Sequence, residues 1–272
     1  MRIIIKNANF SVYGISDISG LMNTLMSKFH GITSSNKASV EAFLRALGVD
    51  GSNNIWSKIK HLYMPCLGIP DDGDNALYDI IGGSNFPKTD YATTATIEAK
   101  RGVVPTSRGS TIGTVALSGI TAANQSFFAS FTRYSLQSIG QSSGVQVQLG
   151  SNSTGLGAKW ENTVMTSAYM GDSSVKIEVS KDTGFSTPNW IVLSCRENGS
   201  RKMICADNNT TSSTLESSLT VAPAVAHLAK GYVCTSIFGI CDGLTASEAS
   251  TVSSAISTFI TAFGIENTVT VS

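Results

Sequence analysis

Residues 189–207 place two apolar runs on either side of Asn198-Gly199. An Asn-Gly dipeptide readily adopts the two positive φ angles of a type I′ turn, so this stretch predicts a β-hairpin. A two-residue loop also fixes the register of the two strands. The expected cross-strand pairs are Glu197 with Ser200, Cys195 with Lys202, Leu193 with Ile204, Ile191 with Ala206 and, on the other face, Val192 with Cys205.

Both faces of this hairpin are largely apolar. A hairpin of that kind cannot stand alone in water, so we expect an inner pair of a larger sheet with something packed on each side. The chain is therefore expected to be rich in β-structure.

After Tyr91 short strand-like runs alternate with turn residues. The runs are 94–99, 111–117, 127–134, 145–149, 163–169, 175–179, the hairpin, and 231–240. This spacing predicts an antiparallel β-sandwich or jelly roll, because doubling the sheet is how such strands cover their edges. We expect a mainly β protein with its jelly-roll domain over 67–272, after a strand and short helices over 1–66, since Gly, Pro and Asp break the pattern between 65 and 90.

Three helices are predicted within the first 66 residues, after a strand at 2–10. Apolar spacing places them at 18–29 between Asp17 and Gly31, at 40–47 between Ser35 or Asn36 and Gly48, and at about 54–64 before Pro65. Helices this short need a partner surface. Packing within the protein is the favoured interpretation, and an anchoring module that docks on another protein is the alternative.

A further helix is predicted near the end of the chain. Thr245 and Glu248 form a Thr-x-x-Glu capping box, and Gly264 supplies the stop. Its apolar face consists of Val252, Ile256, Phe259, Ile260 and Phe263. We expect this helix to lie against the sheet, and the N-terminal strand is the candidate partner of a last short strand at 268–272.

The charge balance excludes several classes of partner. Lys and Arg together number 19, as do Asp and Glu, and charged residues make up only 14% of the chain. No electrostatic footprint for nucleic acid or anionic lipid follows, and no run is long enough to span a bilayer. The first residues lack the features of an export signal. A hydroxyl-rich, weakly charged β surface is common in virion proteins, lectins and secreted β proteins.

Metal and cofactor sites are not predicted. The cysteines are odd in number and show no paired metal spacing, so reduced, buried thiols in a protein assembled in a cytoplasm are expected. They are Cys66, Cys195, Cys205, Cys234 and Cys241. The Asp-rich stretch at 70–75 does not fit an EF-hand loop and is interpreted as a turn.

Catalytic residues are not predicted either. The Gly-x-Ser-x-Gly string at 140–144 precedes a strand pattern, whereas a nucleophile elbow requires a helix. His30, His61 and His227 lack partners in the sequence, so isolated surface or capping histidines are expected. Glu161, Glu178 and Glu197 are the candidates for a glycosidase pair, but their local sequences do not place two carboxylates side by side on one strand.

Four aromatic residues lie on or near the predicted strands: Trp160, Trp190, Tyr169 and Tyr134. Core packing is the favoured use of these residues. Stacking of a sugar ring on an exposed aromatic residue, as in a lectin, is the alternative.

The order of elements in roughly the last third of the chain resembles a known family. A hairpin with strands 190–195 and 202–207, a strand at 232–240 and a helix that opens at 243–248 together look like the closing half of laminin-G or concanavalin-like jelly rolls. The following helix, which ends in Ala262-Phe263-Gly264, resembles the variant found in bacteriophage tail and head appendage proteins. The resemblance implies glycan or protein binding. It implies no metal site, because no calcium ligand of that family maps onto a residue here.

We therefore expect a structural virion protein of a bacteriophage, a fibre or a capsid or tail appendage, that contributes to attachment to host-surface glycans. The expected location is the virion, after assembly in the host cytoplasm. Other virion proteins are the expected partners, and a homotrimer with the N-terminal helices at or near the contact is the expected assembly. The alternative is a free-standing lectin-like module. A hydrolase ranks third, so the protein is not expected to be an enzyme.

The turn at Asn198-Gly199 can be tested by substitution. Asn198→Ala and Gly199→Val are each expected to lower the unfolding free energy by about 1 kcal/mol or more, because the new residue must adopt a positive φ angle. Thermal unfolding of both variants measures the loss. Two unchanged melting temperatures would show that the turn is of another type.

Overall fold

The computed structural model describes the backbone of residues 17–71, 77–86, 95–105, 112–116, 119, 125–135, 142–149, 155–161, 164–171, 176–185, 189–197, 200–206, 211–215, 225–228, 233–266 and 268–270. Side-chain surroundings are described for residues 17–71, 77–85, 96–104, 119, 126–131 and 234–266.

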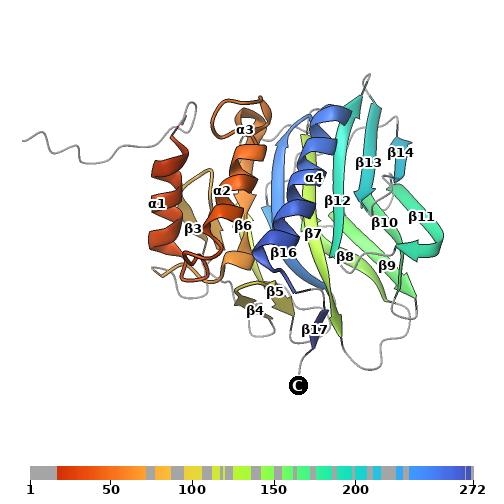
Figure 1. Cartoon of the computed structure of the whole chain (residues 1–272). Coiled ribbons are helices and arrows are strands. Elements are labelled where there is room, and N and C mark those ends of the chain that lie inside the picture. Colours follow the sequence, from red (N-terminus) through yellow and green to blue (C-terminus); the bar gives the residue numbers. More distant parts are fainter. Residues whose placement is uncertain are drawn as a thin grey trace, which may run out of the picture.

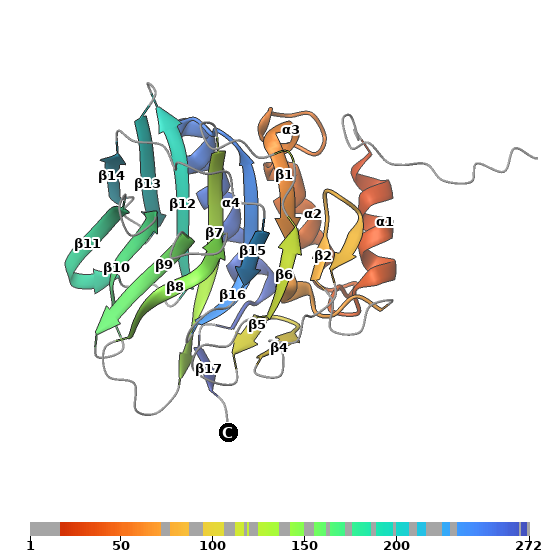
Figure 2. The same cartoon turned by 180° about the vertical axis from the view of Figure 1, so that it is seen from behind.

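Two β-sheets lie face to face, and helices cover the outer face of the larger sheet (Figures 1 and 2). The helices are α1 (Ile18–Lys28), α2 (Lys37–Ala46), α3 (Ile55–Lys58), the 3-10 turn η1 (Pro65–Leu67) and α4 (Ala246–Phe263). This arrangement confirms the predicted mainly β, antiparallel sandwich with a short helical N-terminal segment and a C-terminal helix on the sheet.

Among the described residues, the larger sheet has 11 strands, of which eight follow the order β14-β13-β12-β7-β16-β1-β2-β3. These are β1 (Ile59–Tyr63), β2 (Leu77–Asp79), β3 (Ser84–Phe86), β7 (Gln125–Ser135), β12 (Asn189–Glu197), β13 (Ser200–Ala206), β14 (Thr211–Leu215) and β16 (Val233–Asp242). The other three are β4 (Ala95–Glu98), β5 (Gly102–Pro105) and β17 (Thr268–Thr270).

The described part of the smaller sheet has six strands in the order β11-β10-β9-β8-β15-β6. They are β6 (Ile112–Ala116), β8 (Ser142–Leu149), β9 (Gly155–Glu161), β10 (Val164–Gly171), β11 (Lys176–Phe185) and β15 (Val225–Leu228). Strand β11 contacts β13 and β14, and β3 contacts β6. The edge strands of the two sheets therefore contact each other at both edges of the sandwich.

The register predicted for the hairpin is confirmed. Strands β12 and β13 pair Glu197 with Ser200 through to Ile191 with Ala206, as expected from a two-residue loop. The turn residues Asn198 and Gly199 lie outside the described residues. The hairpin is an inner pair, flanked by β7 and β14, with α4 on one side and β10 on the other.

The capping signals of α4 are also confirmed. Thr245 Oγ1 accepts a hydrogen bond from the Glu248 backbone NH at 3.2 Å, and Glu248 Oε2 accepts from the Thr245 NH at 2.8 Å. Gly264 ends the helix in the left-handed region, with φ 76°. No helix in the described part of the chain is both long and apolar enough to cross a membrane.

Two of the three N-terminal helices match their predictions, and the third does not. Helix α1 starts after Asp17, which accepts a hydrogen bond from the Ser19 NH, and α2 starts after Asn36. The helix expected over about 54–64 ends at Lys58, where β1 begins. Every residue from 61 to 67 is buried, and such a continuous buried run suits a strand covered on both faces.

The apolar core between the helices and the larger sheet joins distant parts of the chain. Phe43 of α2 meets Phe259 of α4, with ring centroids 5.0 Å apart. Phe128 of β7 belongs to the same core and lies against Gly239 of β16, where a larger residue would strike its ring. On the opposite face of the sheet, the rings of Tyr63 and Phe238 stack at 6.2 Å.

The last strand, β17, pairs with β7 in parallel. Its expected partner, the strand at 2–10, lies outside the described residues. The boundary expected after residue 66 stays a prediction. The described parts on its two sides share the larger sheet through β1 and share one core.

An ion pair joins α3 to α4. Lys58 Nζ lies 2.6 Å from Glu248 Oε2 and 2.7 Å from Oε1. Partial burial opposes the ionisation of Glu248, but the hydrogen bonds from Lys58 and from the Thr245 NH, together with the Lys58 charge, outweigh it. The pKa of Glu248 therefore lies below its ordinary value of 4.5.

A lowered pKa makes this contribution to stability depend on pH. The stabilisation should be complete above the unfolded-state pKa and should vanish as the pH falls through the lower folded-state pKa. We expect Glu248→Gln to cost about 1 kcal/mol of unfolding free energy near neutral pH and almost nothing at the acidic end.

Denaturant unfolding of both proteins from neutral to acidic pH measures this difference. Glu41→Gln serves as control, because Glu41 pairs with Arg45 on an exposed face of α2, and should cost at most about 0.5 kcal/mol. A Glu248→Gln difference that is the same at every pH would contradict the expected linkage.

Candidate functional site

Strands β9, β10 and β11 of the smaller sheet alternate between apolar and polar rows. Two rows of cross-strand partners are entirely apolar: Leu156–Met170–Ile177 and Ala158–Ala168–Val179. The rows between them are Gly155–Gly171–Lys176, Gly157–Tyr169–Glu178 and Lys159–Ser167–Ser180. Because residues alternate between the faces of a sheet, the two sets lie on opposite faces.

The apolar rows belong to the face that meets the larger sheet. Strand β10 contacts β12 and β13 across the sandwich, and burial there removes apolar surface from water. The polar rows therefore lie on the outer face. Figure 2 shows this face toward the viewer, with no other described helix or strand over it.

Tyr169 lies on β10, the strand next to the edge strand β11, and several of its neighbouring positions on this face are glycine. Gly157 is its cross-strand partner on β9, Gly171 follows two positions along β10, and Gly155 is a diagonal neighbour. Glycine within a strand commonly marks a place where a ligand or another backbone approaches closely. The register thus places an aromatic residue beside three positions that carry no side chain, and the row continues beyond Gly157 to Val145 on β8.

The other aromatic candidates occupy different positions. Trp190 pairs with Phe131, which is fully buried. Trp160 is two residues after Ala158 on β9, so it shares the inner face of the sheet with Leu156 and Ala158. Tyr134 pairs with Val269 of β17. Tyr169 is therefore the one of the four whose row position is on the outer face of the smaller sheet.

The candidate carboxylates are not cross-strand partners of one another. Glu178 shares the row of Tyr169, Glu161 pairs with Val164 at the end of β9, and Glu197 pairs with Ser200 in the larger sheet. Among the described strands, the register places no two of these three residues opposite each other. Ser142 of the string at 140–144 begins β8, so a strand stands where a nucleophile elbow requires a helix.

The histidine prediction is wrong for His61. This residue is 6% exposed, and its Nδ1 lies 2.7 Å from Oδ2 of the buried Asp79. The two residues are 18 positions apart and meet because β1 pairs with β2. His30 is exposed and its Nε2 lies 2.9 Å from Asp71 Oδ1, and His227 lies on β15 opposite Thr114 and Gln148.

Asp79 uses its second oxygen as well. Its Oδ1 accepts from the backbone NH groups of Leu62 at 3.1 Å and Ile81 at 3.0 Å. The ring of His61 stacks on Tyr63 at 6.4 Å, and burial, with the Asp79 charge, raises the pKa of Tyr63. Strands β1 and β2 share a single register pair, and the Ile80 NH also bonds to Leu62 O at 2.9 Å. The contacts of Asp79 with His61 and the Leu62 NH therefore add to a short strand pairing and fasten β2 to β1.

Three thiols are confirmed as free and buried: Cys66, Cys234 and Cys241. Burial raises the pKa of each, which keeps the thiol protonated and poorly reactive. Cys195 and Cys205 are not register partners, as expected. Within the described part of the chain no group of three or more His, Cys, Asp or Glu side chains could hold a metal ion.

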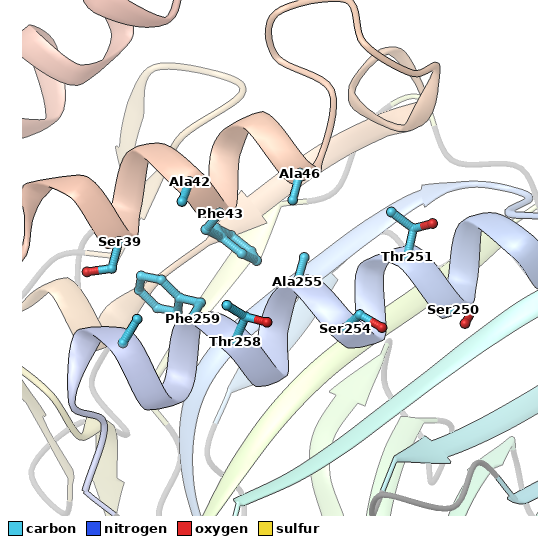
Figure 3. A pocket seen from close by; sticks show the side chains of 11 residues that line it. Ser39, Ala42, Phe43, Ala46, Ser250, Thr251, Ser254, Ala255, Thr258 and Phe259 are labelled. Carbon is cyan, nitrogen blue, oxygen red and sulfur yellow. The ribbon is translucent and has the colours of Figure 1, made fainter.

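A groove of about 400 Å³ runs between α2 and α4 (Figure 3). Its lining residues are small, hydroxylic or apolar: Ser39, Ala42, Phe43, Ala46, Ser250, Thr251, Ser254, Ala255, Thr258, Phe259 and Ala262. Two hydroxyls bond to their own helices, Ser39 to Asn36 O at 2.6 Å and Thr251 to Ser247 O at 3.1 Å. The lining holds no titratable side chain, so this groove cannot supply acid–base chemistry.

No protein-family model and no curated protein sequence matches this chain. Solved structures do match its fold. A sialidase of Trypanosoma rangeli, in complex with sialic acid, is 9% identical with a TM-score of 0.51, and the match covers 79% of this chain and 38% of that one.

The binding domain of botulinum neurotoxin serotype D is 12% identical with a TM-score of 0.47, over 75% of this chain and 53% of that one. A type C botulinum neurotoxin structure, described as dependent on two ganglioside molecules for cell entry, is 11% identical with a TM-score of 0.48, over 75% and 52%. The chain spans little more than half of these structures at most, and at such identities the likeness concerns the fold alone.

The buried His61–Asp79 pair predicts a large loss of stability on truncation. Asp79→Ala is expected to cost about 3 kcal/mol of unfolding free energy, because His61 and two backbone NH groups would stay buried without their acceptor. Denaturant unfolding measures the loss. The control Asp242→Asn weakens a partly exposed pair with Lys60 that is less buried than His61–Asp79, and it should cost about 1 kcal/mol or less. Equal losses in both variants would contradict the assigned role.

Proposed function

We propose that this chain is a non-catalytic, glycan-binding β-sandwich module and that the outer face of β9, β10 and β11 is its ligand surface. The observation that carries the proposal is the position of Tyr169, an aromatic residue bordered by Gly155, Gly157 and Gly171 in the sheet register. This is the function predicted above as the alternative to a virion role.

The physical basis is the match between this row pattern and a sugar ring. A pyranose presents an apolar CH face, which packs on an aromatic ring, and a rim of hydroxyls, which need hydrogen-bond partners. The neighbouring positions Ser167 and Ser180 carry hydroxyls, and Glu178 carries an acceptor. The glycines at 155, 157 and 171 leave the positions on the β9 side of Tyr169 and toward the end of β10 without side chains, which gives a sugar room to approach.

The comparison with the sialidase agrees with this class of ligand. That protein is described in complex with sialic acid, and its fold likeness covers 79% of this chain. We carry a glycan ligand over to this chain as part of the proposal. Hydrolysis is not carried over, because at 9% identity the likeness concerns the fold alone and a fold does not fix an activity.

The virion role stays a prediction, as do the location in a phage particle and the homotrimer. None of the three solved structures named above is a virion protein. Glycan attachment is common to both interpretations, so the proposed surface is compatible with either.

A glycan array probed with the full-length protein tests the proposal. We expect saturable binding to a subset of glycans, a loss of about tenfold or more in affinity for Tyr169→Ala, and retention for Tyr169→Phe, which keeps the ring. Thr258→Ala, in the groove between α2 and α4, serves as control and should bind as the unmodified protein does. Unchanged melting temperatures show that the variants fold.

Two results would overturn the proposal. One is the absence of binding to any glycan by a folded, full-length protein. The other is full affinity in Tyr169→Ala together with lost affinity in Thr258→Ala, which would move the ligand to the helical face.

A further inference from the structure

We propose that the groove between α2 and α4 is the docking site of residues 1–16, the part of this chain that precedes α1. This docking is separate from the proposed glycan binding, because the groove lies on the helical face and the candidate glycan surface is the outer face of the smaller sheet. Three features support it: the lining of the groove, the sequence of residues 1–16 and the position at which α1 begins.

The groove combines an apolar floor with free hydroxyls on its rim (Figure 3). Phe43 and Phe259, which are buried, form the floor. Ser250 and Ser254 stand four residues apart along α4 at the rim, and their hydroxyls make no hydrogen bond with the described part of the chain. An occupant therefore needs apolar side chains for the floor together with hydrogen-bonding groups for the rim.

The exposed side of α4 leaves this groove open. Every exposed position from 247 to 262 is Ser, Thr or Ala, and none of the groove-lining residues is charged. On most exposed helices, long charged side chains lie along apolar surface and cover it. Short side chains cannot do this, so the apolar floor stays accessible, and covering it with an apolar occupant is favourable.

Residues 1–16 have the composition that this lining accepts. Eight of the 16 are large and apolar, among them the run Ile3-Ile4-Ile5, and only Arg2 and Lys6 are charged. A peptide segment bound on a helix surface also presents backbone NH and C=O groups, for which hydroxyls can serve as acceptors and donors. The segment therefore suits both the floor and the rim of the groove.

The position of α1 puts the groove within reach of this segment. Helix α1 contacts α2, which forms one wall of the groove, and packed helices lie about 8–10 Å apart. Sixteen residues can span up to about 50 Å, whereas the lining from Ser250 to Ala262 is about 18 Å long. A segment tethered this closely meets its site at an effective concentration of about millimolar, so even a weak contact is populated.

Strand β17 is the competing partner, because the sequence predicts a strand at 2–10 that could pair with it. Figure 1 shows β17 at the lower end of the molecule, below the helices, while α1 begins at its own upper end. The groove, whose wall α2 contacts α1, is therefore the site that the segment meets first.

Limited digestion of the full-length protein with trypsin tests the docking, because Arg2 and Lys6 are cleavage sites within the segment. We expect cleavage after Lys6 to be about tenfold slower, or more, than in a synthetic peptide of residues 1–16, since a docked segment must open before it is cut. Ser254→Trp and Ala42→Trp place a large ring in the groove from its two walls, and each should restore rapid cleavage. Mass spectrometry follows the loss of the first six residues.

Ser257→Trp is the matched control, because Ser257 is an exposed residue of α4 outside the groove lining. It should leave the segment protected, and unchanged melting temperatures show that the variants fold. Rapid cleavage of the unmodified protein would overturn the proposal. Protection that persists in both groove variants would also overturn it and would favour pairing with β17. Protection that appears only where light scattering detects an oligomer would assign the groove to a second copy of the chain instead.

Discussion

Strands β7 and β16 are buried on both faces, and this double burial decides where the other layers lie. Phe128 and Ile237 belong to the core under the helices, whereas Phe127, Ala129 and Phe238 are buried outside that cluster. A strand pair that is apolar on both faces needs two covers. Helix α4 provides one directly after β16, where the Leu244 NH bonds to Ser126 Oγ at 2.9 Å, and the smaller sheet provides the other.

Features that depend on neighbouring residues could be predicted from the sequence, and features that depend on distant partners could not. The hairpin register follows from its loop length, and the α4 cap needs only Thr245, Glu248 and Gly264. The helix expected over about 54–64 failed because Ile59 and Leu62 have helical spacing, while the strand they form pairs with β16, far along the chain. Pairing with a distant strand overrides the helical spacing of residues 59–63, and the sequence of those residues does not reveal the pairing.

The candidate site, too, could be predicted from the sequence only where it depends on neighbouring residues. Tyr169 could be named from the sequence as one of four aromatic residues, but its face could not be assigned. That assignment needs the register of three strands, because the glycines around it come from both β9 and β10. His61 and Asp79 were missed for a similar reason, since their contact requires the pairing of β1 with β2. The Gly-x-Gly spacing of Gly155 and Gly157 was the one local signal available.

The two outer faces of the sandwich differ in a way that bears on affinity. The helical face carries a groove without charge, and the sheet face carries the aromatic, cationic and hydroxyl rows. Backbone ladders hold those rows in place before any ligand arrives, so binding has to order only a few side chains. A shallow sheet face still buries little of a sugar, which limits the affinity of one site. Several weak sites held in one assembly gain strength through effective concentration, so the proposed glycan binding and the predicted homotrimer would reinforce each other.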